Sequence, residues 1–253
     1  MLAVVGNLSF DRVAGDPPRI GGGPYHAARG LRLLAAQCMV LTRCAEADRS
    51  FLLPRLAALG VSLRLLPGTR TASFSFTYDG EVRTMSVDSI GETWTPQDAR
   101  TVDRRVRWVH VAPLLRSDFP AETLAELAHG RHLLLDGQGL VRRPAVGRLQ
   151  LDADFDPEVM RHVSMLKLAE EEALVVGDIG SLGVPEIIVT LGSRGSIVHA
   201  NGRETRVPAW PLPRDPTGAG DAFSAAYLVS RATGHAPAAA ARRATAVVGA
   251  TLR

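Results

Sequence analysis

The sequence predicts an α/β fold in which helices cover both faces of a mostly parallel sheet. Short apolar runs alternate with helix-like segments through most of the 253 residues, which is the pattern of βαβ units. One segment, 73–87, departs from this pattern by alternating strictly with a period of two, which is typical of a separate hairpin. A chain of this length forms one large domain, or a domain with a small appendage.

The elements expected in chain order are short strands and the helices that connect them. The strands are expected at 3–6, 39–42, 108–111, 132–136, 165–168 and 187–190. The helices are expected at 25–35, 50–59, 121–128, 170–175, 219–232 and 236–248. Because a helical connection returns the chain to a parallel neighbour, the central sheet is expected to be mostly parallel.

The segment 73–87 is expected to form a β-hairpin around Asp79-Gly80, a residue pair suited to a type I′ turn. One face of the hairpin would be aromatic and the other polar, as in a small sheet that covers something. We therefore expect a β-sheet lid built from about 8–20 and 72–88, inserted in the α/β body. The cross-strand pairs that this turn predicts are Tyr78 with Glu81, Phe76 with Arg83 and Phe74 with Met85.

The composition excludes several classes of protein. A hydrophobic content of 46%, a charged content of 22% and a mean hydropathy of +0.06 are ordinary for a globular protein with a core. No apolar run reaches the roughly 18–20 residues that span a bilayer, and the first residues carry no basic leader. Cys38 and Cys44 are too few for a disulfide framework or a zinc cluster. We expect a cytoplasmic protein without a membrane partner.

The charge pattern argues against two further classes. The isoelectric point is about 9.3, but the net charge is only +3 and the arginines are scattered, so a nucleic-acid partner is not expected. Lys167 is the sole lysine, and it does not stand in the sequence G-x-x-x-x-G-K-[ST] of a P-loop. Nucleotide chemistry would therefore need a different cradle for phosphate.

Such a cradle is predicted by the heptad Asp215-Pro216-Thr217-Gly218-Ala219-Gly220-Asp221, which precedes an apolar helix. The backbone N–H groups of Gly218, Ala219 and Gly220 would lie in a first helical turn, where unpaired donors and the helix dipole favour an anion. Asp221 would place a carboxylate beside that anion. This suits a base that takes a proton from a hydroxyl attacking a phosphoryl group. The alternative is an ordinary helix cap.

Two segments near the N-terminus could bind the acceptor of such a transfer. The glycines Gly21, Gly22 and Gly23 permit a close approach to the backbone and precede a predicted helix. Asp11 follows the first strand at its carboxyl end, where open parallel sheets bind ligands, and its carboxylate can accept hydroxyl protons. A flexible loop and a turn-forming Asp are the alternatives for these two segments.

Two more loops follow apolar strands. One supplies Asp136, Gln138 and Arg142, a set suited to the recognition of hydroxyl groups. The other supplies Thr190 and a glycine-rich turn with Gly192 and Gly195, whose exposed N–H groups could meet nucleotide phosphates. A plain hairpin is the alternative for the second loop.

Together these segments resemble the ribokinase-like (PfkB) carbohydrate kinases. The resemblance runs from Val4 nearly to the C-terminus and is most specific in the motif D-x-T-G-A-G-D at the start of a late helix. It implies a single kinase domain over 1–253, with a ribokinase-like three-layer α/β/α fold and a small β-sheet lid. It also implies ATP and Mg²⁺ as cofactors and a homodimer contact through the lid.

The resemblance assigns roles to individual residues. Asp221 is implied as the catalytic base, and Gly218, Ala219 and Gly220 as the anion hole. The residues implied or proposed to bind the acceptor are Asp11, Gly22, Gly23, His26, Phe74, Asp136, Gln138 and Arg142. The residues that would contact ATP are Thr190, Gly192, Gly195, Thr217, Gly218, Gly220, Ala246 and Gly249, and Glu172 would help to organise Mg²⁺.

The chain departs from the family pattern in three places. Ala169 replaces the Asn of the segment N-x-x-E, so the handling of Mg²⁺ is expected to differ, with Glu170 or Glu171 taking part. His26 stands where an Asn commonly contacts the sugar, so the fine specificity is expected to differ. The sequence also stops soon after Gly249, so the adenine side is expected to be more open or completed by a partner subunit.

The sequence therefore predicts ATP-dependent phosphorylation of a hydroxyl on a small sugar or polyol, such as myo-inositol. A nucleoside is the alternative acceptor of the same family, and a phosphorylated sugar remains open. A non-catalytic sensor of sugars or nucleotides on the same fold is the rival class. A dinucleotide-dependent oxidoreductase is disfavoured because the glycines lack the spacing G-x-G-x-x-G.

Overall fold

The computed structural model describes residues 1–13, 15–79, 82–210 and 217–251. Its larger sheet has nine strands in the order β14-β13-β12-β11-β9-β8-β1-β4-β5. The seven strands from β12 to β5 run parallel, and β13 and β14 add an antiparallel edge. The bounds are β1 Leu2–Asn7, β4 Cys38–Arg43, β5 Ser62–Leu66, β8 Trp108–Val111, β9 His132–Asp136, β11 Met165–Ala169, β12 Glu186–Thr190, β13 Ser196–Ala200 and β14 Arg203–Val207.

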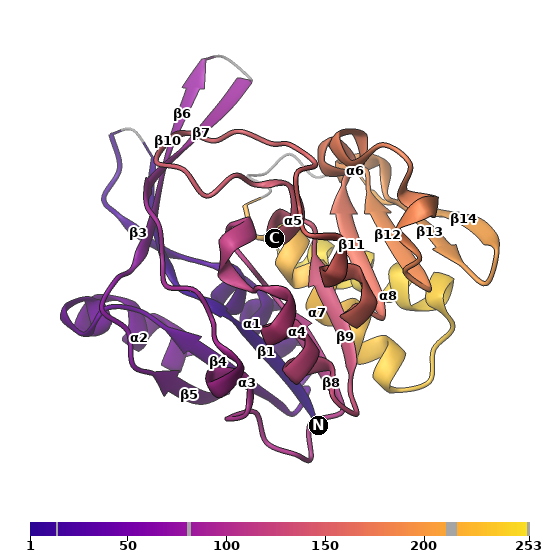
Figure 1. Ribbon diagram of the computed structural model, residues 1–253, viewed down its shortest axis with the longest axis horizontal. Coiled ribbons are helices and arrows are strands. Elements are labelled where there is room, and N and C mark those ends of the chain that lie inside the picture. Colours follow the sequence, from indigo (N-terminus) through magenta and orange to yellow (C-terminus); the bar gives the residue numbers. More distant parts are fainter. Residues whose placement is uncertain (14, 80–81, 211–216, 252–253) are drawn as a thin grey trace.

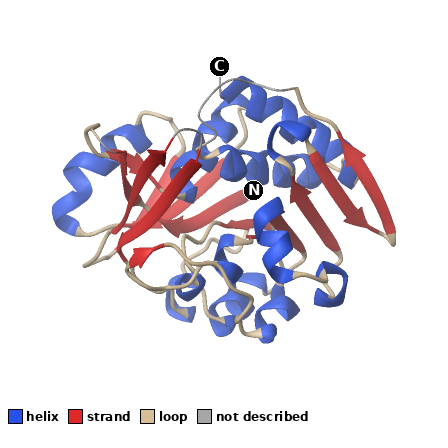
Figure 2. Cartoon of the chain, turned by 90° about the horizontal axis from the view of Figure 1, so that it is seen from above, coloured by secondary structure: helices blue, strands red, loops and turns tan. Residues whose placement is uncertain are grey.

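Helices cover both faces of this sheet (Figures 1 and 2). The hydrophobic core of one face includes α1 Gly23–Leu33, α2 Arg49–Ala57, α7 Ala219–Ala232 and α8 Pro237–Thr251. The core of the other includes α3 Pro96–Ala99, α4 Ala121–Ala128, α5 Gln138–Val141 and α6 Glu170–Val176. Alternate residues of β1 serve the two faces, since Val4 packs in the first core and Val5 in the second. The predicted three-layer α/β/α fold is confirmed.

Short 3₁₀ turns complete the connections on this framework. They are η1 Glu46–Asp48, η2 Arg116–Asp118, η3 Pro157–His162, η4 Ile179–Leu182 and η5 Gly192–Arg194. Cys38 and Cys44 are both buried free thiols, so no disulfide joins them.

The close packing of α1 against α7 brings the two predicted glycine motifs together. A side-chain carbon placed on Gly30 would lie 3.2 Å from the Ala222 backbone, so the helices cross where both residues are small. Glycine and alanine allow the two backbones to approach more closely than larger residues would. As a result, the start of α1 and the start of α7 lie beside one another at the same edge of the sheet.

A second sheet of five strands stands above this edge, in the order β10-β7-β6-β2-β3 (Figure 1). Its strands are β2 Ser9–Val13, β3 Arg19–Gly21, β6 Ala72–Asp79, β7 Val82–Ser89 and β10 Gly147–Arg148. Phe74, Phe76 and Val87 are buried in a small cluster with Leu114 and Leu115 of the body. The expected aromatic face thus packs toward the body, and β10 is an addition that the sequence did not predict.

The predicted register of the hairpin is wrong by one position at the turn. Phe76 pairs with Met85 and Phe74 with Val87, instead of with Arg83 and Met85. Asp79 pairs with Val82, and the predicted turn residue Gly80 lies outside the described part of the chain. Each partner moves by two residues, which leaves the described side chains on their predicted faces. The alternation therefore fixes the faces of the hairpin but not its pairs.

Candidate active site

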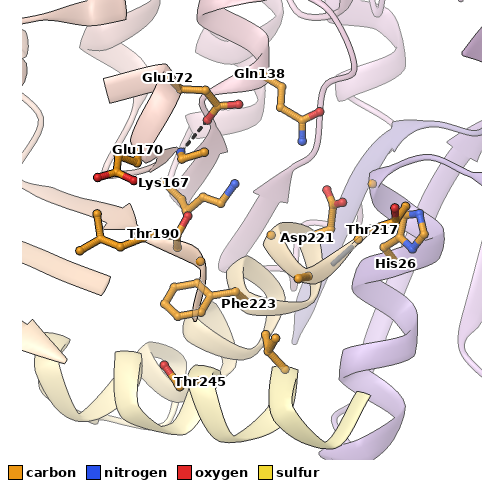
Figure 3. Close-up of a pocket in the computed structure, with 18 of the residues that line it drawn as sticks. His26, Gln138, Lys167, Glu170, Glu172, Thr190, Thr217, Asp221, Phe223 and Thr245 are labelled. Carbon is orange, nitrogen blue, oxygen red and sulfur yellow. Dashed lines mark hydrogen bonds between the residues drawn. The ribbon is translucent and has the colours of Figure 1, made fainter. Parts of the chain in front are cut away.

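A cleft of about 1160 Å³ opens at the carboxyl ends of the parallel strands, beneath the small sheet. With the exception of Asp136, every residue that the sequence predicts for the site lines this cleft. These residues are Asp11, Gly22, Gly23, His26, Phe74, Gln138, Arg142, Glu172, Thr190, Gly192, Gly195, Thr217, Gly218, Ala219, Gly220, Asp221, Ala246 and Gly249. Figure 3 shows several of them around the start of α7. Segments more than 200 residues apart in the sequence thus share one cavity.

The residues of the predicted anion hole lie in the turn that begins α7. Gly218 has a φ of 78° in the left-handed region and serves as the N-cap, so the N–H groups of Ala219 and Gly220 lie in the first turn. Helix geometry leaves such N–H groups without intrahelical partners. A side-chain carbon on Gly218 would lie 2.1 Å from His26 Nδ1, which shows how closely α1 seats its imidazole against this turn. Asp215 and Pro216 of the motif lie outside the described residues.

Asp221 is buried in the first turn of α7, with 7% of its surface exposed. Its Oδ1 atom has no hydrogen-bond partner among the described residues. Burial and the negative charge of Asp136 raise the pKa of Asp221 to about 6, against the opposing effect of Lys167. A carboxylate with this pKa is ionised at neutral pH and is basic enough to accept a proton from a ligand.

Lys167 places a positive charge beside the anion hole, and the sequence reasoning did not predict it as a site residue. It lies on β11, is buried, and points toward Asp221 in Figure 3. A side-chain carbon on Gly220 would lie 2.9 Å from Lys167 Nζ. Burial alone would lower the pKa of Lys167, but the charges of Asp136, Glu172 and Asp221 raise it above the usual value. The available signal was a single lysine within an otherwise apolar strand.

The prediction that Asp136 contacts the acceptor is wrong, because its side chain is turned into the core. It is fully buried and does not line the cleft. Its carboxylate lies 2.6 Å from His110 Nε2, accepts a 2.6 Å hydrogen bond from Ser224 Oγ and lies 3.3 Å from Lys167 Nζ. Burial alone would raise the pKa of Asp136, but Lys167 and His110 hold it at about 2. Asp136 is therefore an ionised partner of these groups.

The acceptor half of the cleft combines polar groups from the body with apolar side chains from the small sheet. Asp11 on β2 accepts a 2.9 Å hydrogen bond from Ser9 Oγ. Gly23 has no room for a side chain, since a carbon there would lie 2.8 Å from Asp221 Oδ1, so the glycine loop passes directly beside the proposed base. Phe76, Met85 and Leu114, which were not predicted, join Phe74, His26, Gln138 and Arg142 in this lining.

The donor half lies on the other side of α7, between β12 and α8. Thr190 ends β12, and Gly195, with a φ of 97°, packs against the backbone of Val207. The wall from α8 carries small residues, including Thr245, Ala246 and Gly249. Trp210 lines the cleft and is highly exposed. Thr245 and Trp210 were missed because nothing in their local sequence indicates a ligand.

Acidic residues at the start of α6 line the same half. Glu172 is buried and accepts a 2.7 Å hydrogen bond from the Ala169 backbone N–H (Figure 3). Glu170 forms an ion pair with Arg194, and Glu171 is exposed. Carboxylate oxygens are ligands that Mg²⁺ prefers, usually one or two together with water and substrate phosphates. These carboxylates fit Mg²⁺, although Ala169 lacks the side-chain amide of the Asn that it replaces.

Comparisons with known proteins show which proteins this chain is similar to. The model of the pfkB family carbohydrate kinases matches residues 156–253. An inositol 3-kinase of Oryza sativa subsp. japonica is 32% identical over 157 residues, which are 51% of this chain, and the match spans 40% of that relative's length. A ribokinase of Bacillus subtilis (strain 168) is 28% identical over 237 residues, covering 89% of this chain and 76% of the relative.

A solved structure extends the likeness over the whole chain. It is a pyrophosphate-dependent kinase in the ribokinase family, complexed with a pyrophosphate analog and myo-inositol. The match has a TM-score of 0.88 and 27% identity, and it covers 100% of this chain and 95% of the other. The fold is of the ribokinase type. Residues 156–253 match the pfkB family carbohydrate kinases, and the whole chain shares the fold of this ribokinase-family structure. Among the described residues, no helix is both long and apolar enough to cross a membrane.

Proposed function

We propose that this chain is an ATP-dependent kinase that phosphorylates one hydroxyl of a small sugar or polyol, with a myo-inositol-like ring as the preferred acceptor. The observation that carries the proposal is the position of Asp221. Its carboxylate is buried, its Oδ1 lacks a partner among the described residues, and it stands beside the anion hole of Gly218–Gly220. An unpaired carboxylate oxygen at this position is available to accept a proton from a ligand.

The reaction uses the two halves of the cleft together. An acceptor hydroxyl oriented toward Asp221 loses its proton to the carboxylate, and its oxygen forms a bond to the γ-phosphorus of ATP. The bond from that phosphorus to the β–γ bridging oxygen breaks, and ADP leaves with the electron pair. The N–H groups of Ala219 and Gly220, with the Lys167 ammonium beside them, neutralise charge on the transferring group. Closure of the lid over the acceptor would exclude water.

The carboxylates of α6 would hold Mg²⁺. Glu172 is the main candidate, with Glu171 or Glu170 completing the set through water. When bound, the ion would supply positive charge to the donor phosphates. Glu172 thus keeps the acid of the family segment N-x-x-E. The neighbouring glutamates offer oxygen ligands in place of the Asn side chain that is missing at Ala169.

A cyclic polyol suits the acceptor half. Asp11 and Gln138 offer acceptor atoms for hydroxyl groups, Gln138 and Arg142 offer donors, and all three line the cleft. Phe74 and Phe76 add an apolar surface from the small sheet, against which the carbon skeleton of a ring can pack. The inositol 3-kinase relative and the myo-inositol complex support the same class of acceptor.

Inorganic pyrophosphate is a second candidate donor, and a specific observation favours it. The solved relative that covers the whole chain is described as pyrophosphate-dependent. Against it, the cleft of this chain continues past the anion hole along Thr245, Ala246 and Gly249, a wall that a pyrophosphate would not reach. We retain ATP as the proposed donor because the small residues of this wall leave room for a base.

The test is a matrix of donors and acceptors. ATP and pyrophosphate are each incubated with myo-inositol, ribose and a nucleoside, and phosphate esters are detected by mass spectrometry. Ester formed from myo-inositol and ATP supports the proposal. Ester formed only from the nucleoside would contradict the proposed acceptor, and ester formed only with pyrophosphate would contradict the proposed donor. Ligand-induced stabilisation without any ester would support a sensor.

A variant separates the two donors on structural grounds. Ala246→Trp fills the α8 wall without touching the anion hole, so it should raise the KM for ATP more than tenfold and leave turnover with pyrophosphate unchanged. Equal KM values for ATP in the variant and the wild type would contradict a base site on α8.

Two further expectations remain proposals. A homodimer through the lid is proposed from the family resemblance and is tested by light scattering with and without acceptor. The cytoplasmic location is likewise proposed, and imaging of the tagged protein in its source cell tests it.

A further inference from the structure

Behind the proposed base lies a network of buried polar side chains, of which the reaction above uses only Lys167. His110 on β8, Asp136 on β9 and Ser224 on α7 are fully buried, and Lys167 on β11 is nearly so. His110 Nε2 and Ser224 Oγ each lie 2.6 Å from a different oxygen of Asp136, and Lys167 Nζ lies 3.3 Å from the oxygen that Ser224 contacts. Four elements thus converge on one carboxylate.

Burying these charged groups lowers the stability of the fold unless their mutual interactions offset the penalty. Taking ionised groups out of water carries a penalty of several kcal/mol per ion, and well-packed apolar residues often replace a buried ion pair without loss of stability. Here two carboxylates, Asp136 and Asp221, are buried close together. One atom from each of them and one from His110 all lie within 4.8 Å of one another. The ammonium of Lys167 brings positive charge to the same place.

Several carboxylates act on the charge of Lys167, and the structure shows an ion pair with one of them. Its charge interacts with Asp136, Glu172 and Asp221. It forms an ion pair with Asp136, whereas Asp221 Oδ1 has no hydrogen-bond partner among the described residues. An ion pair between Lys167 and Asp221 would neutralise the base and stabilise its ionised form.

We infer that Asp136 is a positioning residue that binds Lys167 and so prevents this lysine from pairing with the base Asp221. The inference rests on the proposed function, since it concerns the base of the proposed transfer. Two consequences follow from the geometry. The ammonium is held beside Gly220, where it faces an anion, and the Asp221 carboxylate is left available to an acceptor hydroxyl.

The negative charge of Asp136 also acts on the base directly, because it raises the pKa of Asp221. A neighbouring negative charge makes ionisation harder, and together with burial it raises the pKa of Asp221 to about 6. The titratable and charged groups that act on Asp221 or lie against its turn are His26 of α1, His110 of β8, Asp136 of β9, Arg142 after α5 and Lys167 of β11, and Glu172 of α6 acts on Lys167. Removal of the negative charge at position 136 should therefore lower the pKa of the base.

The sole lysine gives a direct readout of this network. Protein without a lysine-containing tag, labelled with [¹³C]lysine, yields one Cε signal, and that signal reports the titration of charges near Lys167. In the wild type, an inflection is expected at about pH 6 as Asp221 titrates. In Asp221→Asn the inflection should vanish, and in Asp136→Asn it should move to lower pH. An inflection unmoved by Asp136→Asn would overturn the inference.

Kinetics provide the second arm. Asp136→Asn should lower kcat by about tenfold to a hundredfold, since displaced catalytic groups cost on that order. The acid limb of its pH profile should move to lower pH. Ser224→Ala removes one hydrogen bond but no charge, so its acid limb should stay near that of the wild type. A lowered kcat with an unmoved acid limb in Asp136→Asn would indicate a merely structural role.

Glu186→Gln is the matched control for a buried, ion-paired carboxylate. Glu186 begins β12 at the opposite edge of the sheet and pairs with Arg231. Its variant should lose stability and leave the Lys167 signal and the acid limb unchanged. If the wild type transfers no phosphoryl group to any acceptor, the proposed function fails, and the lysine signal still tests whether Asp136 controls Lys167.

Discussion

Helix α7 meets a buried carboxylate near each of its ends, and the two carboxylates differ in their partners. Glu186 near the C-terminal end and Asp221 at the N-terminal end are almost equally buried, with 6% and 7% of their surfaces exposed. Glu186 accepts a hydrogen bond from the Tyr227 hydroxyl, and both of its oxygens contact Arg231 Nε, at 3.0 and 3.2 Å. Asp221 Oδ1 has no such partner in the described chain.

The glycines that flank α7 show the same difference. Gly218 before the helix and Gly234 after it both have left-handed backbones, with φ values of 78° and 88°. Gly218 is pressed against His26, while nothing lies within 4 Å of a side-chain carbon placed on Gly234. At the C-terminal end of α7 the buried carboxylate is satisfied by protein partners. The N-terminal end leaves groups unsatisfied that a ligand would satisfy.

The largest effect is expected from Asp221→Asn. Loss of the base should reduce kcat by about 10²–10⁴-fold, the usual contribution of a positioned general base. The change is measured as acceptor-dependent release of ADP at saturating donor and acceptor. Turnover within about tenfold of the wild type would be too fast for the loss of a base of this kind.

The same variant should become more stable than the wild type above neutral pH. The pKa of Asp221 in the folded chain is about 6, above its ordinary value of 3.8, so ionisation at high pH penalises folding. The penalty is absent below the ordinary value and grows as the pH rises through about 6, reaching about 3 kcal/mol at most. Thermal unfolding at pH 8 should favour the variant, and the difference should close toward pH 4. A variant less stable at pH 8 would show that Asp221 has a structural partner.

Activity should follow the same titration. Because the base must be ionised, kcat/KM of the wild type should fall about tenfold per pH unit below a pKa near 6. A profile measured from pH 4.5 to 8 in buffers of constant ionic strength gives the acid limb. An acid limb near pH 4 would mean that the Asp221 carboxylate has an ion-pair partner in solution, as Glu186 has in the structure.

Gly218→Ala and Gly234→Ala form a matched pair across the helix. Both substitutions place a side chain on a left-handed backbone, which costs about 1–2 kcal/mol. Only Gly218→Ala also displaces His26, so it should raise the KM for the acceptor about tenfold or more. Gly234→Ala should lower the melting temperature through backbone strain alone and keep the wild-type KM. Equal KM values in the two variants would show that His26 does not contribute to acceptor binding.

The smallest effect on activity is expected from Glu186→Gln. The change leaves Arg231 without its charged partner, so unfolding in denaturant should show a loss of about 2–3 kcal/mol. Its kcat should remain within about twofold of the wild type, because surface and core changes away from the site act on stability. A large loss of kcat would mean that the two ends of α7 are coupled.

The sequence predicted those parts of the site that are encoded locally. The heptad ending in Asp221, the glycine loop at Gly22 and the turn at Gly195 each carry their own backbone signal, and all three line one cleft. The layered fold was predictable because apolar strands and helices alternate along the chain.

What the sequence could not supply depends on which strands become neighbours. Asp136 and Lys167 are 31 positions apart in the sequence, and their ion pair exists because β9 and β11 pair in parallel with Lys167 opposite Asp136. His110 joins them from β8, on the far side of β9. Nothing local distinguishes an Asp that faces the cleft from one turned into the core, which is why Asp136 was misassigned to the acceptor.

The most direct test of the account follows the phosphorus atom itself. ³¹P NMR of the wild type with ATP, Mg²⁺ and myo-inositol should show a phosphate monoester growing as the γ-phosphate signal declines, without free phosphate in its place. The same sample with Asp221→Asn should show neither change over the same time. Ester formation by Asp221→Asn at the wild-type rate would contradict the assignment of Asp221 as the base that the N-terminal end of α7 leaves unpaired.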